Sequence, residues 1–198
     1  MSQVQILAIP GSLRAASWNA ALLRLAQERA PEGVQVEIWE GLRDVPPFSE
    51  DNEGESAPAT VHEMRDAIAS ADALLVSTPE YNGGVPGQLK NALDWASRPY
   101  GISAVVGKPA GVISASTGSF GGRWAQEEVR KALRLSGAAV TGEGLAVGKA
   151  AERLAETCVA DEEILTGIDD VLEQLSAKVA EMQRELEELE ELEEIDAA

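Results

Sequence analysis

Cysteine and histidine are almost absent from this chain of 198 residues, which holds one of each, Cys158 and His62. A single cysteine excludes an internal disulfide and a cysteine-rich metal centre, and a single histidine leaves the common zinc sites without ligands. His62 falls in a predicted helix among charged residues, where a solvated side chain is a better interpretation than a catalytic triad. We therefore predict no metal site and no histidine-based catalysis.

Long apolar runs are also missing. No run approaches the roughly 18 residues of a membrane span, and the amino terminus lacks the basic and apolar regions of a secretory signal. These absences predict a cytoplasmic protein without a membrane span. The acidic residues must then belong to a solvated surface, either of an ordinary cytoplasm or of one adapted to high salt.

Basic residues are scarce, with 16 against 34 acidic residues and a net charge of −18. Such a field disfavours nucleic acid and anionic membranes as partners, because binding to phosphate groups needs clustered lysine and arginine. Any pocket for an anionic cofactor must therefore be local. We expect small molecules as the ligands of this chain.

The pattern that remains is a repeated alternation of strand and helix in a chain long enough for one domain with a sizeable core. Predicted strands cover 4–9, 34–38, 73–77, 110–115 and 139–140, and predicted helices cover 17–29, 60–70, 87–97, 122–136 and the segment from 161. Thr60 is the expected N-cap of the second helix, with Glu63 completing a capping box. Five strands separated by helices predict an α/β fold, a parallel sheet of order 2-1-3-4-5 with helices on both faces.

The loop after the third predicted strand is the most informative segment. Between Ser77 and Gly87 it holds an aromatic ring, an amide side chain, two prolines and three glycines. Loops at the carboxyl ends of buried strands bind ligands in open α/β sheets, and glycines let the backbone approach a flat ligand closely. A ligand site is predicted here.

The turn after the first predicted strand, from Gly11 to Asn19, forms a second polar cluster. Its polar side chains are those of Ser12, Arg14, Ser17 and Asn19. Together with free backbone N–H groups at the start of a helix, they would converge on one phosphate. The turn lacks the lysine of a P-loop and the glycine pattern of an ordinary dinucleotide fold. A capped turn with incidental polar residues is the alternative.

A third loop, from Ser114 to Gly122, follows the fourth predicted strand and is rich in serine and glycine. The loops after strands one, three and four would lie along one edge of the sheet, around the point where the strand order reverses. One ligand would then touch all three.

In these motifs the chain resembles the NAD(P)H-dependent FMN reductases of flavodoxin-like fold, a family that includes quinone, azo-dye and chromate reductases. The resemblance spans residues 4 to 145, through Gly-Ser-x-Arg-x-x-Ser-x-Asn at 11–19, Pro-Glu-Tyr-Asn-Gly at 79–83, Leu-Lys-Asn-Ala-Leu-Asp-Trp at 89–95 and Ser-x-Gly-x-x-Gly-Gly at 116–122. Where family members often read Gly-Gly-x-Arg, this chain has Arg123 directly after the glycines. The resemblance implies FMN as cofactor, NADPH or NADH as electron donor, and a homodimer or homotetramer.

The resemblance also implies which residues bind the cofactor. Ser12, Arg14, Ser17 and Asn19 would hold the FMN phosphate, Pro79, Glu80, Tyr81, Asn82 and Gly83 would border the isoalloxazine and ribityl chain, and Ser116, Thr117 and Gly118 would line the other side of the ring. Backbone N–H groups from Glu80 to Gly83 would stabilise the negative charge of the reduced flavin. The Glu80 side chain is expected to point away as a solvated carboxylate. For Tyr81, ordinary loop packing is the alternative.

The predicted function is an FMN-dependent oxidoreductase that passes hydride from NAD(P)H to FMN and on to a quinone, an azo compound or a metal oxyanion. No catalytic side chain is required, because FMN carries the hydride chemistry. Two other classes stay open, a one-electron carrier like flavodoxin and a scaffold that uses its acidic terminal helix. Trp95 and Trp124 fall at helical spacing, which favours core or subunit packing. Lys90 and Asp94 are expected to form a surface ion pair.

The terminal helix is predicted to be longer than a small domain is wide. Its apolar residues recur at spacings of four and three, as in a coiled coil, and are Ile168, Leu172, Leu175, Val179, Met182, Leu186 and Leu189. Because residues 181–198 hold nine acids and one arginine, we divide the chain into an FMN-binding domain at 1–180 and an acidic helical extension at 181–198. The extension would either contact another subunit, more strongly at high salt, or remain a solvated tail.

Overall fold

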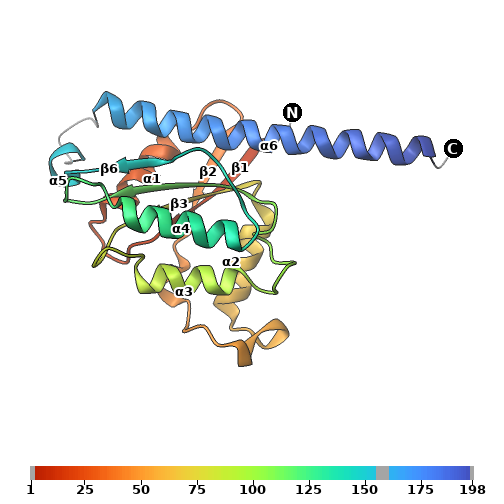
Figure 1. Ribbon diagram of the computed structural model, residues 1–198, viewed down its shortest axis with the longest axis horizontal. Coiled ribbons are helices and arrows are strands. Elements are labelled where there is room, and N and C mark those ends of the chain that lie inside the picture. Colours follow the sequence, from red (N-terminus) through yellow and green to blue (C-terminus); the bar gives the residue numbers. More distant parts are fainter. Residues whose placement is uncertain (1–2, 155–160, 197–198) are drawn as a thin grey trace.

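The computed structural model describes residues 3–154 and 161–196, and side chains as far as Glu193. Cys158 lies outside the described residues. The described chain forms one parallel sheet covered on both faces by helices (Figure 1). None of the described helices is both long and apolar enough to cross a membrane.

The strands are β1 (Val4–Pro10), β2 (Val34–Ile38), β3 (Ala73–Thr78), β4 (Pro109–Ala115), β5 (Ala139–Val140) and β6 (Leu145–Val147). Their order β2-β1-β3-β4-β5 confirms the predicted topology. The sixth strand was not predicted. It pairs with the second half of β4, while β5 pairs with the first half, so the edge strand is interrupted by a loop at 141–144. Three residues are too few to show a strand pattern in the sequence.

The helices are α1 (Trp18–Glu28), α2 (Ala59–Ser70), α3 (Gly87–Ala96), α4 (Arg123–Leu135), α5 (Ala150–Arg153) and α6 (Glu162–Asp196). The segment between β2 and α2 contains three short 3-10 turns, η1 (Gly41–Asp44), η2 (Glu50–Asn52) and η3 (Gly54–Ser56). The expected cap at Thr60 is wrong. The carbonyl of Pro58 accepts hydrogen bonds from Val61 and His62, which places Thr60 inside the first turn of α2.

Successive strand residues pack on opposite faces of the sheet, as the pleat of a strand requires. Leu7 and Ile9 of β1 join a core with α2, α3 and α4, whereas Ile6 and Ala8 join a second core with α1 and α6. Trp95 lies wholly inside the first core, where its indole N–H donates to the carbonyl of Pro46 at 2.8 Å. Its expected packing role is confirmed.

Helix α6 covers the face of the sheet that holds the second core, and then runs on past the sheet (Figure 1). Arg29 at the end of α1 pairs with Asp169, and this hydrogen bond lowers the pKa of the Asp169 carboxyl. The seam is buried as far as Val179, whereas Leu186 and Leu189 are exposed. The first half of α6 therefore belongs to the core, and the acidic second half does not.

Candidate functional site

The carboxyl ends of β1, β3 and β4 lie next to one another. Pro10 at the end of β1 is paired with Ser77 of β3, and Thr78 is paired with Ser114 of β4. The loops that follow these strands therefore meet at one edge of the sheet. The register brings together the three predicted segments, 11–19, 79–83 and 116–118.

Local hydrogen bonds shape the first of these, residues 11–19, which we call the phosphate loop after its predicted role. The Gly11 N–H donates to the carbonyl of Ser77 at 2.7 Å, and a Cβ at Gly11 would lie 2.8 Å from that oxygen. Glycine is required here because the loop passes so close to β3. The Ser17 hydroxyl caps α1 by accepting from the Ala20 N–H at 3.3 Å.

Several hydrogen-bond donors of the phosphate loop have no partner among the described residues. The Ser12 hydroxyl accepts from the Arg14 N–H at 3.3 Å, and the Arg14 side chain is exposed and forms no ion pair with the described residues. The N–H groups of Leu13, Ala15 and Ala16 make no hydrogen bond within the described chain. Free N–H groups at a helix start, with an unpaired guanidinium, fit a phosphate group.

Asn19 has a different place from the one predicted. Its side chain is 2% exposed and bridges strands instead of facing the loop surface. The amide oxygen accepts from the Ala115 N–H at 2.9 Å and from the Ser77 hydroxyl at 3.0 Å, while the amide nitrogen donates to the Ala115 carbonyl at 3.0 Å. Asn19 thus ties α1 to the ends of β3 and β4 and fixes the phosphate loop relative to the other two loops.

The second of these loops, residues 79–83, turns sharply at its tip. Tyr81 and Gly84 exchange two backbone hydrogen bonds of 3.1 Å, and the residues between them, Asn82 and Gly83, have φ values of 53° and 77°. Asn-Gly is the preferred pair for such a turn, and this signal was present in the sequence. Because the Tyr81 N–H is used in the turn, it is not one of the free donors expected from this loop. Pro79 is buried and anchors the loop at the end of β3.

Glu80 is not the solvated carboxylate that was expected. One carboxylate oxygen, Oε2, accepts from the Trp124 N–H at 3.0 Å and from the Ala125 N–H at 3.3 Å, at the start of α4. A carboxylate is favoured there because the first N–H groups of a helix lack partners and carry the positive end of the dipole. In the opposite direction, the Glu128 carboxylate of α4 accepts from the Val85 N–H of the loop at 3.0 Å. The second loop is therefore clamped to α4.

The third loop is held by the segment that the sequence did not reveal. The Ser116 N–H donates to the carbonyl of Val147 in β6 at 3.1 Å, and the Gly118 carbonyl accepts from the Lys149 N–H at 3.0 Å. The Ser116 hydroxyl lies 3.4 Å from the Gly118 carbonyl, and Thr117 is exposed. This leaves the outer surface of residues 116–118 open to a ligand.

Exposed aromatic rings stand around these loops. Tyr81 is 53%, Phe120 67% and Trp124 56% exposed, and the rings of Phe120 and Trp124 lie 5.3 Å apart between centroids. Trp124 was expected to pack in the core or against another subunit, and the core alternative is wrong, because the residue lies at the exposed start of α4. Tyr81 is also exposed, so packing within its loop leaves the ring accessible to a ligand. Exposed apolar rings next to one another indicate a binding surface.

The chain is similar to known proteins of one family. The family model described as NADPH-dependent FMN reductase matches residues 4–152. The chain belongs to this family. This chain is similar to a solved structure, that of a flavoenzyme NAD(P)H:(acceptor) oxidoreductase from Paracoccus denitrificans, with a TM-score of 0.78 and 32% identity. The match covers 88% of this chain and 98% of the other.

Curated relatives support the same family. A quinone reductase of Pseudomonas putida is 48% identical over 134 residues, which are 67% of this chain and 72% of the relative. An NAD(P)H-dependent FMN reductase of Pseudomonas aeruginosa is 42% identical over 130 residues, or 66% and 69% of the two chains. This FMN reductase is accordingly an oxidoreductase with FMN as cofactor and NAD(P)H as electron donor, as predicted.

Proposed function

We propose that this FMN reductase transfers hydride from NAD(P)H to FMN and on to a quinone. The observation that carries the proposal is the open edge formed by three loops, with free donors on one side and exposed rings of Tyr81, Phe120 and Trp124 on the other. Flat aromatic acceptors stack on such rings. Relatives named quinone reductase and 2-hydroxy-1,4-benzoquinone reductase add support.

The chain's own residues bind and orient the cofactor. We assign the FMN phosphate to the N–H groups of the phosphate loop with Ser12 and Arg14, while Ser17 and Asn19 hold the loop in shape. The ring and ribityl chain would lie between residues 79–83 and 116–118. When bound, FMN supplies the hydride chemistry. The free N–H groups of residues 82 and 83 would then face the charge that develops on reduction.

The absorption spectrum of the purified protein tests this proposal. We expect bleaching of the flavin band on anaerobic addition of NADPH and its full return on addition of a quinone. A one-electron carrier would instead need a partner protein for reoxidation, and slow return with quinone alone would favour that class.

Azo compounds and metal oxyanions are the other predicted acceptors. We expect oxyanions to react less well, because they gain nothing from the exposed rings.

Replacing Arg14 tests the phosphate assignment. We expect Arg14→Ala to weaken FMN binding by about 1.5 to 3 kcal/mol, because it removes a charge-assisted hydrogen bond to the phosphate. Flavin fluorescence titration of the apoprotein measures this directly. Riboflavin, which lacks the phosphate, is the control and should bind both proteins equally. Equal losses for FMN and riboflavin would place Arg14 away from the phosphate.

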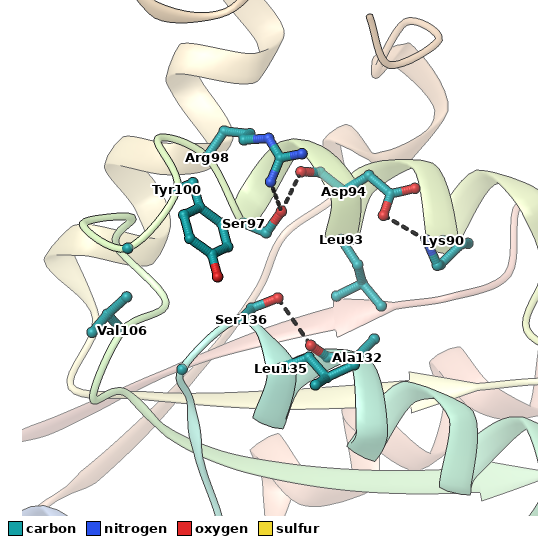
Figure 2. A pocket seen from close by; sticks show the side chains of 12 residues that line it. Lys90, Leu93, Asp94, Ser97, Arg98, Tyr100, Val106, Ala132, Leu135 and Ser136 are labelled. Carbon is teal, nitrogen blue, oxygen red and sulfur yellow. Dashed lines mark hydrogen bonds and ion pairs between the residues drawn. The ribbon is translucent and has the colours of Figure 1, made fainter. Parts of the chain in front are cut away.

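A second hollow, lying at the other end of α3 and α4, suggests how copies of the chain associate. This groove of about 490 Å³ is bordered by both helices, and Figure 2 shows Tyr100 and Leu135 at its walls. Tyr100 is 83% and Leu135 74% exposed, with Ile102 and Val106 also exposed nearby. The predicted Lys90–Asp94 ion pair lies at its edge and is confirmed. We propose that the exposed apolar residues at this groove form the interface of a homodimer, since several large apolar side chains exposed at one place mark an association surface.

A charge placed in the groove should separate the subunits. We expect Leu135→Glu to halve the mass measured by light scattering, because a carboxylate would be buried without a partner in the interface. Leu189→Glu on the acidic extension is the matched control and should leave the mass unchanged. Loss of association in Leu189→Glu, or on truncation after Ala180, with Leu135→Glu unaffected would make the extension the interface.

We propose that the FMN-binding domain ends at residue 180 and the acidic extension begins at 181, because burial of the α6 seam ends at Val179. The truncated chain also tests the scaffold alternative. We expect it to keep quinone turnover, since every assigned cofactor contact lies before residue 119. The cytoplasmic location stays a prediction.

A further inference from the structure

A groove beside the phosphate loop gathers three arginines in an otherwise acidic protein. It has a volume of about 630 Å³ and lies between α1, the end of β2 and the turn η1. Arg14 comes from the phosphate loop, Arg24 from α1 and Arg43 from η1, and all three line the groove. The chain as a whole carries a net charge of −18. A local cluster of guanidinium groups in such a protein needs an explanation.

None of these three guanidinium groups forms an ion pair with the described residues. Among residues 3–154 and 161–193, Arg29, Arg98 and Arg153 pair with carboxylates, but no arginine of the groove does. Arg43 donates one hydrogen bond of 2.7 Å to the carbonyl of Leu13, which holds it against the tip of the phosphate loop. Its remaining donors, and those of the other two side chains, are free for an anion.

The acidic residues of the groove do not cancel this charge. Glu37 and Glu40 also line it, so the five ionised side chains leave one positive charge in excess. Guanidinium groups bind phosphates through paired N–H groups, whereas carboxylates can accept from sugar hydroxyls. A lining of both kinds suits a sugar that carries a phosphate.

The strand order separates this groove from the proposed flavin ring. The ring loops follow β3 and β4, on one side of β1, whereas the groove lies at the end of β2, on the other side. An FMN whose phosphate lies in the phosphate loop thus extends away from the groove. A dinucleotide donor stacked on the ring must lead its adenosine end out of the site, and the groove with its three arginines adjoins the phosphate loop.

We propose that this groove binds the ribose phosphate at the adenosine end of NADPH and makes the enzyme prefer NADPH to NADH. Arg24 and Arg43 hold the phosphate, with Arg14 between it and the FMN phosphate. In dinucleotide-binding folds of another architecture, an arginine accommodates this same phosphate. The inference rests on the proposed position of FMN, but not on the nature of the acceptor.

Calorimetric titration of the FMN-loaded protein with two fragments tests the groove without turnover. We expect 2′,5′-ADP, which carries the ribose phosphate, to bind at least about tenfold more tightly than 5′-AMP, which lacks it. Arg24→Gln and Arg43→Gln should each remove about tenfold from the 2′,5′-ADP affinity and leave 5′-AMP unchanged. Arg134→Gln, an exposed arginine on the last turn of α4, is the matched control and should change neither.

Steady-state kinetics supply the second readout. KM for NADPH should rise in Arg24→Gln and Arg43→Gln while KM for NADH and kcat stay the same. Equal binding of both fragments by the unaltered protein, or equal losses for both in the variants, would overturn the inference. Weaker FMN binding in the Arg24 variant, with the fragments unaffected, would show that the arginines serve the FMN phosphate instead. Failure to reduce quinones would refute the proposed acceptor while leaving the fragment result intact.

Discussion

Asn19→Ala is expected to lower the free energy of unfolding of the apoprotein by about 3 kcal/mol. The change removes one buried amide and leaves three groups without partners, the Ala115 N–H, the Ala115 carbonyl and the Ser77 hydroxyl. Each buried polar group without a partner costs about 1 to 3 kcal/mol. Urea unfolding of the protein without FMN measures the loss.

The apoprotein is the decisive form, because it separates a structural amide from a phosphate ligand. If Asn19 bound the phosphate instead, its replacement would weaken FMN binding and leave the stability of the apoprotein unchanged. That result would contradict the structural role described here. Asn52→Ala is the matched control. Asn52 is exposed in η2 and its side chain makes no hydrogen bond with the described residues, so we expect a change within about 0.5 kcal/mol.

Gly121→Ala is expected to destabilise the protein by about 3 kcal/mol and to disturb FMN binding. Gly121 has a φ of 67°, a conformation that costs other residues about 1 to 2 kcal/mol. Its Cβ would also lie 2.7 to 2.8 Å from backbone atoms of Ala146, Val147 and Gly148, so the third loop would have to move away from β6. Such overpacking costs about 1 to 3 kcal/mol.

Gly118→Ala in the same loop is the control for this prediction. The nearest atom to its Cβ would be the Ser116 hydroxyl oxygen at 3.6 Å, and its φ is not positive. We expect stability to change by no more than about 0.5 kcal/mol. A similar loss in both variants would show that the loop tolerates no side chain at all, and that the contact with β6 is not the cause.

The layered fold could be predicted from the amino-acid sequence. Apolar runs such as Ala73–Thr78, separated by helical spacing, require strands buried on both faces, and this pattern predicted the sheet order and the edge where the loops meet. Local signals for the phosphate loop were also readable, because a capping serine and a nearby arginine act within a few residues. The Asn-Gly pair at 82–83 is an equally local signal, because it acts on the backbone of two neighbouring residues.

The contacts of the polar side chains in the site could not be predicted in this way, because they depend on how the chain folds. Asn19 and Glu80 were both assigned from their place in a loop, yet their partners lie in β4 and α4, 96 and 44 residues away along the chain. The interrupted edge strand and the meeting of Arg24 with Arg43 depend on contacts of the same kind. A hydrogen bond between distant residues leaves no periodicity in the sequence, because it is set by how layers pack and not by neighbours along the chain.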